Sequence, residues 1–390
     1  MDVKTLVEIT EADFFTGVPD SQLKPLCDYL VDIYGINSKH HMIGANEGNC
    51  VGLAAGYYLA TNRVPVVYMQ NSGEGNMLNP AASLLHHKVY GIPCIFIIGW
   101  RGEPGIHDEP QHAYQGEITL KLLEDMGIDS FIVSKDTTKE ILSDNMLKFK
   151  RLLQDGRSVA FVICKGALSY NGKPVYKNDY VMMREEIIRH IVRISEDDPI
   201  ISTTGKASRE LFEIREANGQ GHECDFLTVG SMGHSSSIAL GISLNSSKKV
   251  WCVDGDGAVL MHMGAMAIIA QANPENFVHI VINNGAHESV GGMPTVAEGI
   301  NLPGIARGCG YKNVYCVSDY EKLDQALQLA KEMKELVFIE AKAAIGSRND
   351  LGRPAKSPME NKNAFIEFLR YKNSDKERNP ECQHLKIQRY

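Results

Sequence analysis

The fold is decided by the stretch VWCVDGDGA at residues 250–258, which is followed by VHIVINNGA at residues 278–286. Each is an apolar run of strand length that ends in a polar, glycine-containing turn. Between them, residues 260–272 carry apolar side chains at helical spacing and predict one helix. Strand, turn, helix and strand form a βαβ unit with parallel strands. Both polar turns are therefore expected at the carboxyl edge of one sheet, where open α/β sheets bind ligands.

These two turns offer oxygen ligands, namely the carboxylate of Asp256 and the amide of Asn283 or Asn284. Hard oxygen donors suit Mg²⁺ or Ca²⁺. Gly255 and Gly257 let the backbone approach an anion, and a helix that starts there directs N–H groups at it. One carboxylate is little charge for a metal site made of protein alone, so Mg²⁺ shared with a ligand's phosphates fits better. Two unrelated turns are the simpler alternative.

The pair of turns resembles the magnesium and diphosphate motif of the thiamine-diphosphate-dependent enzymes. The resemblance implies that Asp256, Asn284 and the backbone carbonyl of Ala286 hold Mg²⁺, with Asn283 as the alternative ligand. It also implies that the cofactor thiamine diphosphate is bound by residues of both turns, which are Gly255, Asp256, Gly257, Ala258, Asn283 and Asn284.

Length and composition limit the classes of protein to which this chain can belong. A chain of 390 residues favours two domains, and 44% hydrophobic residues with 35 glycines suit α/β layers. A formal charge of −8 argues against nucleic-acid or anionic-membrane partners. Nine cysteines without any Cys-x-x-Cys predict reduced thiols in a cytoplasmic protein. We also expect no membrane span and no signal peptide.

Strands and helices alternate on both sides of a polar stretch at residues 171–180. This pattern predicts an α/β protein with two doubly wound parallel-sheet domains. The resemblance implies a pyrimidine-binding domain at 1–170, a linker at 171–180, a diphosphate- and Mg-binding domain at 181–375, and no middle domain. Residues 376–390 are expected to form a polar tail. Residues 15–21 are expected to form a loop.

A second motif, Asn46-Glu47-Gly48, precedes the small-residue run at 53–57 and resembles the family's catalytic glutamate segment. The resemblance implies that Glu47 hydrogen-bonds the aminopyrimidine ring and so assists removal of the thiazolium proton. The thiazolium C–H group is a very weak acid, and no ordinary side-chain base removes its proton at a useful rate. Such a glutamate should lie in a dry pocket with a raised pKa. The simpler interpretation is a first-turn acid favoured by the helix dipole.

Two further stretches are expected to contact the cofactor. In the turn Gly230-Ser231-Met232-Gly233-His234, the resemblance implies that Met232 props the cofactor into a bent shape that brings its reacting atoms together. A core methionine in a strand-to-helix turn is the alternative. Ser72 and Gly73 belong to a polar loop at 70–76 that lines the cofactor in the family.

The remaining candidates concern the substrate. The loop at 101–112 carries Arg101, His107 and His112, which suit an anionic substrate, although a solvated acidic loop is equally compatible with the composition. Lys206 follows Gly205 at a helix start, as in an anion site, but without the P-loop pattern. His287 follows the metal turn in a glycine-containing segment expected to be a mobile lid.

Three stretches, at 18–21, 101–112 and 287–292, resemble the phosphonopyruvate decarboxylase family, to which sulfopyruvate decarboxylase is related. The resemblance implies decarboxylation of 3-phosphonopyruvate to phosphonoacetaldehyde and CO₂, in phosphonate biosynthesis of the 2-aminoethylphosphonate type. It implies a homodimer or higher homo-oligomer with active sites between subunits. Met293 stands where the family pattern has Gln. The candidates for gripping the phosphonate are Asp20, Ser21, Arg101 and Lys206, and those for proton handling are His107, His112 and His287.

Alternatives from other classes stay open at this point. The chain is compatible with sulfopyruvate decarboxylase or another thiamine-diphosphate 2-oxoacid decarboxylase or synthase. A catalytically silent cofactor-binding subunit is disfavoured because Glu47, Asp256 and Asn284 are all present. An ordinary nucleotide-binding protein is disfavoured because Gly-x-Gly-x-x-G and the P-loop are absent.

Overall fold

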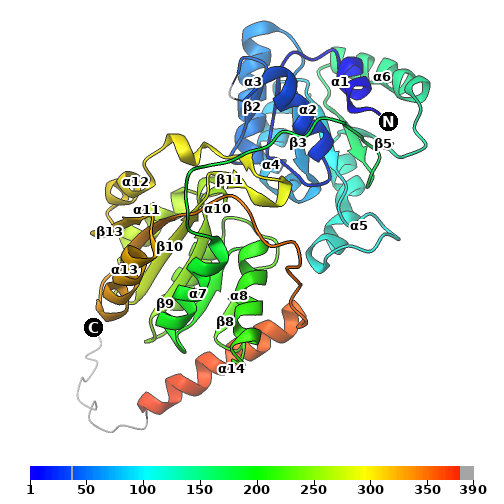
Figure 1. Ribbon diagram of the computed structural model, residues 1–390. Coiled ribbons are helices and arrows are strands. Elements are labelled where there is room, and N and C mark those ends of the chain that lie inside the picture. Colours follow the sequence, from blue (N-terminus) through cyan, green and yellow to red (C-terminus); the bar gives the residue numbers. More distant parts are fainter. Residues whose placement is uncertain (37, 378–390) are drawn as a thin grey trace, which may run out of the picture. The chain divides into compact units, whose positions relative to one another are not determined.

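The computed structural model describes residues 1–36 and 38–377 and divides the chain into two compact units (Figure 1). The first unit contains residues 1–177 together with 286–296, and the second contains residues 178–285 and the chain from 297 onward. The boundary after Lys177 lies inside the stretch expected to be a linker. The expected tail at 376–390 lies outside the described residues from 378 onward.

The first unit is built on a six-stranded sheet in the order β2-β1-β3-β4-β6-β5, in which every pair is parallel. Its central strands are continuous apolar runs buried on both faces, as expected for a parallel sheet covered by helices. The strands are β1 (Phe15–Gly17), β2 (His41–Ile43), β3 (Val66–Gln70), β4 (Ile95–Gly99), β5 (Asp129–Val133) and β6 (Val159–Ile163).

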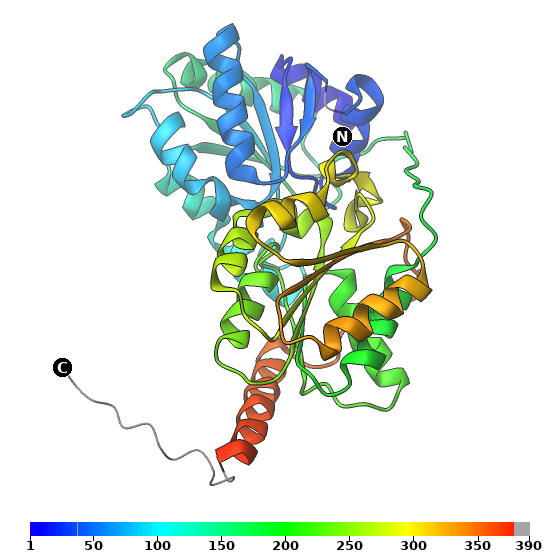
Figure 2. The same ribbon diagram turned by 90° about the vertical axis from the view of Figure 1, so that its left-hand side faces the viewer.

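Helices cover both faces of this sheet (Figure 2). Helix α1 packs against α2 and α6, whereas α3 packs against α4 and the strands β1 and β3. A small antiparallel hairpin also belongs to the unit. The helical elements are α1 (Val3–Thr10), α2 (Lys24–Tyr34), α3 (Glu47–Thr61), η1 (Asn71–Gly73), α4 (Glu74–Pro80), η2 (Ala81–Leu85), α5 (Pro110–Asp125), α6 (Lys139–Gln154) and η3 (Glu288–Val290), and the hairpin strands are β11 (Ala286–His287) and β12 (Met293–Pro294).

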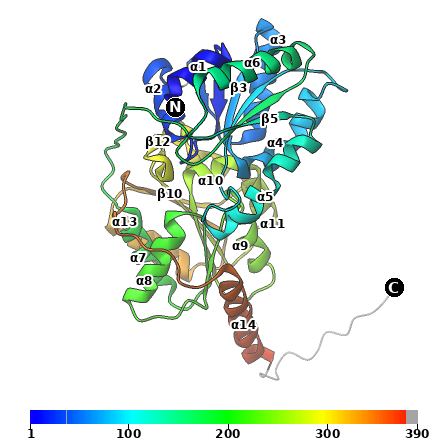
Figure 3. The ribbon, with the colours of Figure 1, turned by 90° about the vertical axis from the view of Figure 1, so that its right-hand side faces the viewer.

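The second unit contains another all-parallel six-stranded sheet, in the order β13-β14-β10-β9-β7-β8. Alternate residues of each strand face opposite helical layers. Thus Trp251 packs in the layer of α7, α8 and α13, and its neighbour Cys252 packs in the layer of α9, α11 and α12. Figure 3 shows α7, α8 and α13 on one side of the strands and α9 and α11 on the other. The strands are β7 (Ile200–Ser202), β8 (Asp225–Leu227), β9 (Val250–Gly255), β10 (Phe277–Asn283), β13 (Asn313–Val317) and β14 (Val337–Lys342).

The helices of the second unit end with a long C-terminal helix whose Phe365 packs in the same layer as Cys252. These helical elements are α7 (Arg184–Ser195), α8 (Lys206–Ala217), α9 (Ser235–Ser243), α10 (Asp256–Met261), α11 (Gly264–Ala272), η4 (Val296–Gly299), α12 (Leu302–Cys309), α13 (Tyr320–Glu332) and α14 (Pro358–Glu377).

The two units share one topology. When the strands are counted within each unit, both sheets follow the order second, first, third, fourth, sixth, fifth. The prediction of two doubly wound parallel-sheet domains without a middle domain is confirmed. In such sheets the order reverses beside the first strand, and ligands bind outside the carboxyl ends there. In the second unit this point lies at β7 and β9, and in the first at β1 and β3.

Three expectations about secondary structure are wrong. Residues 15–17 form strand β1 rather than loop, because they pair with both β2 and β3 in the sheet interior. The expected helix at 260–272 is two helices, and the first starts already at Asp256. The chain between them leaves helical geometry at His262, with φ −133° and ψ 48°. The polar loop expected at 70–76 is mostly helical, because η1 and α4 follow β3 directly. Helix α12 was not predicted.

Within the described part of the chain, no helix combines the length and hydropathy needed to cross a membrane. The eight cysteines described there are all free thiols, and six of them are buried. Such thiols fill core space as small apolar groups.

Candidate active site

Glu47 is the first residue of α3, directly after the cap residue Asn46, whose side chain accepts the N–H groups of Gly48 and Asn49. The Glu47 side chain is buried, and its Oε2 accepts a hydrogen bond from Asn76 Nδ2 at 2.7 Å. Burial raises the pKa of Glu47, and the hydrogen bond from Asn76 opposes this shift. The burial and the raised pKa expected for this residue are therefore present.

The position of the Glu47 carboxyl group requires glycine at residue 73. A Cβ atom on Gly73 would be 2.5 Å from Glu47 Oε1, so a larger residue would displace the carboxyl group. The neighbouring Ser72 accepts a hydrogen bond from Gln70 Nε2 at 2.5 Å. The helical segment after β3, made of η1 and the start of α4, thus places Gly73 and Asn76 around one buried carboxyl group.

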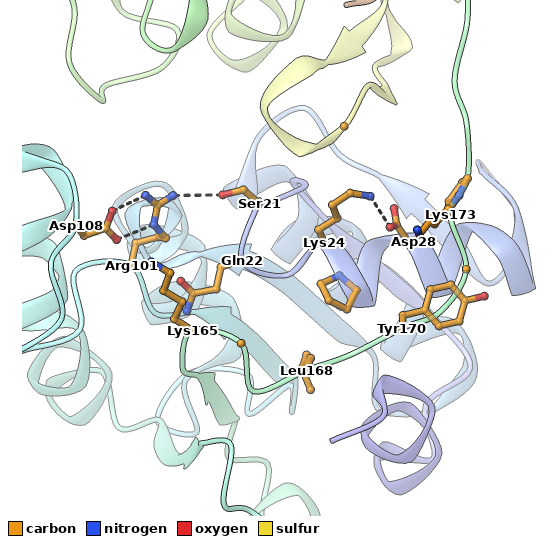
Figure 4. A pocket seen from close by; sticks show the side chains of 15 residues that line it. Ser21, Gln22, Lys24, Asp28, Arg101, Asp108, Lys165, Leu168, Tyr170 and Lys173 are labelled. Atoms are coloured by element: carbon orange, nitrogen blue, oxygen red, sulfur yellow. Dashed lines mark hydrogen bonds and ion pairs between the residues drawn. The ribbon is translucent and has the colours of Figure 1, made fainter. Parts of the chain in front are cut away.

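Arg101 and Ser21 come together in the first unit, where they line a cavity of about 820 Å³ (Figure 4). Arg101 makes a bidentate contact with Asp108, with Nε–Oδ2 at 2.7 Å and Nη2–Oδ1 at 2.5 Å, and its Nη1 donates to Ser21 Oγ at 3.3 Å. The Asp108 hydrogen bonds raise the pKa of Arg101. Burial alone would raise the pKa of Asp108, but the bonds from Arg101 and two backbone N–H groups lower it. A rigid, fully charged guanidinium results.

Asp20 lies beneath this cluster. It is buried, and its Oδ2 accepts the backbone N–H groups of Gln22 at 3.0 Å and Leu23 at 3.2 Å. Its other oxygen, Oδ1, has no hydrogen-bond partner within the described residues. Burial raises the pKa of Asp20 to about 6, against the opposing charge of Arg101. A carboxyl group with this pKa can hold or release a proton near neutral pH.

The three candidate histidines differ. His107 is exposed in the loop before α5. His112 is buried, and burial, together with the Arg101 charge, lowers its pKa to about 4. His287 lies in strand β11, and burial lowers its pKa to about 4 as well. Both rings are therefore neutral at physiological pH.

In the second unit, three turns meet at the carboxyl ends of β7, β8 and β9. Gly230 N donates to Thr204 Oγ1 at 3.0 Å, which joins the second turn to the first. A Cβ atom on Gly233 would lie 2.8 Å from the carbonyl oxygen of Ala258, so the turn at 230–234 is tight against the turn that follows β9. The expected cofactor residues Gly230, Gly233 and Ala258 therefore lie close together, and Thr204, which was not a predicted site residue, holds the turn at 230 in place.

The turn that carries Met232 has an unusual backbone. Gly230, Ser231 and Gly233 all have positive φ angles, of 67°, 44° and 86°. A serine in this region is strained, and such strain is characteristic of functional sites. Met232 is partly exposed at the tip of the turn. The ring of His234, at the start of α9, lies tilted against that of His262, with ring centroids 4.3 Å apart.

Asp256 is the buried first residue of α10, where helix N–H groups favour a negative charge. Behind it, Asp254 Oδ1 accepts hydrogen bonds from Ser235 Oγ at 3.0 Å and Gly255 N at 3.1 Å. The Asp254 carboxylate therefore fixes the turn from which Asp256 projects.

The adjacent asparagines have different surroundings. Asn283 Nδ2 donates to Glu340 Oε1 at 2.7 Å, and its Oδ1 accepts Gly285 N at 2.9 Å. Its side chain is therefore engaged inside the sheet. Asn284 follows the end of β10, and its carbonyl oxygen accepts from Asn178 at 2.9 Å. A carboxylate and an amide oxygen at neighbouring strand ends, with glycine turns beside them, suit Mg²⁺ bound to a diphosphate.

Lys206 begins α8, and its Nζ donates to Ser347 Oγ at 2.6 Å. It belongs to the second unit, whereas Arg101, Ser21 and Asp20 belong to the first. Only those three members of the predicted substrate set are thus brought together within one unit.

Comparison with known proteins identifies the two halves. The profile described as "Thiamine pyrophosphate enzyme, N-terminal TPP binding domain" matches residues 3–134, and the corresponding C-terminal TPP binding domain matches residues 203–341. Phosphonopyruvate decarboxylase of Streptomyces viridochromogenes is 32% identical over 375 residues, which cover 90% of each chain. The chain belongs to the thiamine-diphosphate enzyme family. It is a carboxy-lyase that acts on a 2-oxoacid.

Two more relatives of this thiamine-diphosphate enzyme are similar over most of their length. Phosphonopyruvate decarboxylase of Streptomyces hygroscopicus is 31% identical, with 90% of this chain and 89% of that one covered. Sulfopyruvate decarboxylase of Methanosarcina acetivorans is also 31% identical, with 91% and 95% covered. The relatives are therefore named for two substrates, which are both 2-oxoacids and differ in the anionic headgroup.

Proposed function

We propose that this enzyme decarboxylates 3-phosphonopyruvate to phosphonoacetaldehyde and CO₂, with thiamine diphosphate and Mg²⁺, in the cytoplasm and as a step of phosphonate biosynthesis. The observation that carries the proposal is Arg101, held rigidly by Asp108 beside Ser21 in a cavity with further cationic side chains. A fork of guanidinium N–H groups with an adjacent hydroxyl suits a tetrahedral oxyanion such as a phosphonate. The two relatives named phosphonopyruvate decarboxylase support the same substrate.

Mg²⁺ would be held by Asp256, Asn284 and the carbonyl of Ala286. The engaged side chain of Asn283 supports Asn284 over its neighbour, because both polar atoms of Asn283 already have partners, one in β14 and one in the turn after β10. The glycines at 230, 233, 255 and 257, with Ser231, His234 and Ala258, would surround the diphosphate. Met232, at the tip of the strained turn, would support the bent cofactor.

When bound, thiamine diphosphate would supply the carbon that attaches to the keto group and a cationic ring that takes up the electron pair left behind when CO₂ departs. Glu47 would hold a proton on the aminopyrimidine ring, which its burial and raised pKa favour. Asp20 would be available for proton transfer to the reacting carbon, because it is protonated to a useful extent near neutral pH. His112 and His287 are neutral near neutral pH, so each ring can donate one hydrogen bond and accept another.

The active enzyme would be at least a homodimer, in which Glu47 of one subunit serves the diphosphate site of another.

Substitution of Arg101 by alanine tests the assignment of the headgroup site. It should raise KM for phosphonopyruvate by about 100-fold, as expected for loss of a charged bidentate contact. The dissociation constant for thiamine diphosphate should change less than about threefold. Equal changes in both constants would remove Arg101 from the substrate site.

Sulfopyruvate is the second candidate substrate, supported by the similarity to a sulfopyruvate decarboxylase across nearly the whole chain. Steady-state rates of CO₂ release from phosphonopyruvate, sulfopyruvate and pyruvate separate the candidates. The proposed function predicts the largest kcat/KM for phosphonopyruvate and the smallest for pyruvate, which lacks the second anionic group.

A further inference from the structure

Lys165 lies beside Arg101 because of strand register. Strands β4 and β6 are adjacent and parallel, and Gly99 pairs with Ile163 at their carboxyl ends. Arg101 and Lys165 each follow this pair by two residues. The alignment continues past the strands, since Trp100 N donates to the Ile163 carbonyl at 3.0 Å. Two cationic side chains are therefore delivered to the same edge of the sheet.

Gln22 locks this arrangement. Its Nε2 donates to the carbonyl oxygens of Trp100 at 3.1 Å and Ile163 at 2.7 Å, which bridges the two chain segments that lead to Arg101 and Lys165. Both cations line the same cavity, and Figure 4 shows the Lys165 side chain next to Arg101. The backbone geometry, and not only a flexible side chain, places the pair.

The charges in this cavity are not balanced. Its cationic lining residues are Lys24, Arg101, Lys165 and Lys173. Lys24 is paired with Asp28 at 2.5 Å, and Arg101 with Asp108. Within the described residues, neither Lys165 nor Lys173 has an ion pair or a hydrogen bond from its ammonium group. Two positive charges are left without a counter-charge.

Like charges held side by side repel each other, and a bound anionic ligand offsets this repulsion. A phosphonate, like a phosphate monoester, takes up a second negative charge near neutral pH. A sulfonate carries only one. The arginine, already shared with Asp108, matches one charge of the headgroup, and the unpaired lysine beside it matches a second.

We propose that Lys165 is a specificity-determining residue, which binds the second negative charge of the substrate headgroup and so selects a dianionic phosphonate over a monoanionic sulfonate. This inference rests on the proposed function, because it concerns the same headgroup site. Lys165 requires no rearrangement of the partly buried Arg101–Asp108 contact. It acts as a mobile point charge at the mouth of a preformed oxyanion site.

Lys173 provides a matched control. It is also exposed, cationic and unpaired among the described residues, and it lines the same cavity. Figure 4 shows it with Asp28 and Tyr170, at the other end of the cavity from Arg101. A general electrostatic effect of cavity charge would involve both lysines, whereas direct contact with the headgroup would involve Lys165 alone.

The test compares kcat/KM for phosphonopyruvate and sulfopyruvate with the purified holoenzyme, above the second ionisation of the phosphonate. We expect Lys165→Gln to reduce the phosphonopyruvate value about tenfold through KM, the size of one hydrogen bond to a charged group. The sulfopyruvate value should fall less than about threefold. Lys165→Arg should retain most of the discrimination, and Lys173→Gln should retain all of it.

The outcomes are distinguishable. If the wild type decarboxylates phosphonopyruvate but Lys165→Gln leaves the ratio of the two kcat/KM values unchanged, the inference is wrong and the proposed function stands. An equal loss of discrimination in Lys173→Gln would also overturn it. A wild type that acts on neither substrate, or prefers sulfopyruvate, overturns the proposed function and this inference together. Thermal unfolding of each variant identifies a folding defect, and Lys165→Arg then decides.

Discussion

Asn71 holds the backbone of Arg101 from both sides. Its Nδ2 donates to the Arg101 carbonyl oxygen at 2.8 Å, and its Oδ1 accepts the Arg101 N–H at 3.2 Å. A second bond from Nδ2, to Thr119 Oγ1 at 2.9 Å, ties the same amide to α5. Asn71 is buried, so these groups cannot exchange their partners for water. The position of the guanidinium therefore depends on an asparagine that does not itself line the cavity.

Substitution of Asn71 by serine should consequently impair both stability and substrate binding. Loss of two buried backbone contacts should lower the free energy of unfolding by about 2–4 kcal/mol. KM for phosphonopyruvate should rise about tenfold, since a displaced Arg101 loses its bidentate geometry. Asn145→Ala is the control, because the side chain of that partly exposed asparagine on α6 donates to a carbonyl of its own helix. An Asn71 variant with normal KM would show that Arg101 is positioned by Asp108 alone.

Glu47→Gln should separate cofactor binding from turnover. The amide fits the same buried space and can still meet Asn76, so thiamine diphosphate should bind within about threefold of the wild-type affinity. The rate of CO₂ release should fall about 10²- to 10⁴-fold, the usual contribution of a positioned proton-transfer group. Calorimetry for binding and a coupled CO₂ assay measure the two effects. Wild-type turnover in this variant would remove Glu47 from the mechanism.

Asn283 and Asn284 should have opposite phenotypes. Asn283→Ala removes the buried hydrogen bond to Glu340 and the partly buried one to Gly285 N, and should lower the free energy of unfolding by about 2–4 kcal/mol. Asn284→Ala should instead raise the Mg²⁺ concentration needed for half-maximal cofactor binding by at least about tenfold. Titration of each apoprotein with Mg²⁺ at fixed thiamine diphosphate measures this. A metal defect in Asn283→Ala, with none in Asn284→Ala, would reverse the assignment.

Glu74 should make stability depend on pH. It is buried at the start of α4, and burial raises its pKa from 4.5 to about 8. A folded-state pKa above the unfolded value favours folding with the proton bound. This contribution is therefore complete below about pH 4.5 and is lost as the pH rises through about 8. Its magnitude is on the order of a few kcal/mol.

In Glu74→Gln, this loss of stability with rising pH should be reduced. Unfolding midpoints measured between about pH 5 and 8 should decline less steeply than in the wild type. Glu117→Gln, an exposed change on α5, should follow the wild-type curve. Identical slopes in the wild type and Glu74→Gln would show that the carboxyl group is not held protonated in the folded state.

The parts of the candidate site whose position could be predicted from the sequence lie in short contiguous motifs. Asp256 and Asn284 end neighbouring strands, and Glu47 precedes a helix rich in small residues, so their placement follows from local pattern. Strand β1 could not be predicted, because a three-residue strand that ends in glycine has too little periodicity. The helix expected at 260–272 continues an apolar pattern across His262, where the backbone turns away.

Contacts between residues far apart in the chain could not be predicted from the sequence. Nothing local indicates that Asn71 contacts Arg101, 30 residues away, or that Asn76 contacts Glu47, 29 residues away. Lys165 is one of many exposed lysines until the pairing of Gly99 with Ile163 puts it beside Arg101. Strand order, which no single segment encodes, decides which loops share an edge.

The central claim is most directly tested by following phosphonopyruvate through the reaction with ³¹P NMR, in the presence of thiamine diphosphate and Mg²⁺. The account predicts that the substrate signal is replaced by that of phosphonoacetaldehyde, with one CO₂ released for each molecule consumed and no conversion when the cofactor is left out. An unchanged substrate signal in the complete mixture, or a product in which two substrate molecules are joined, would contradict it.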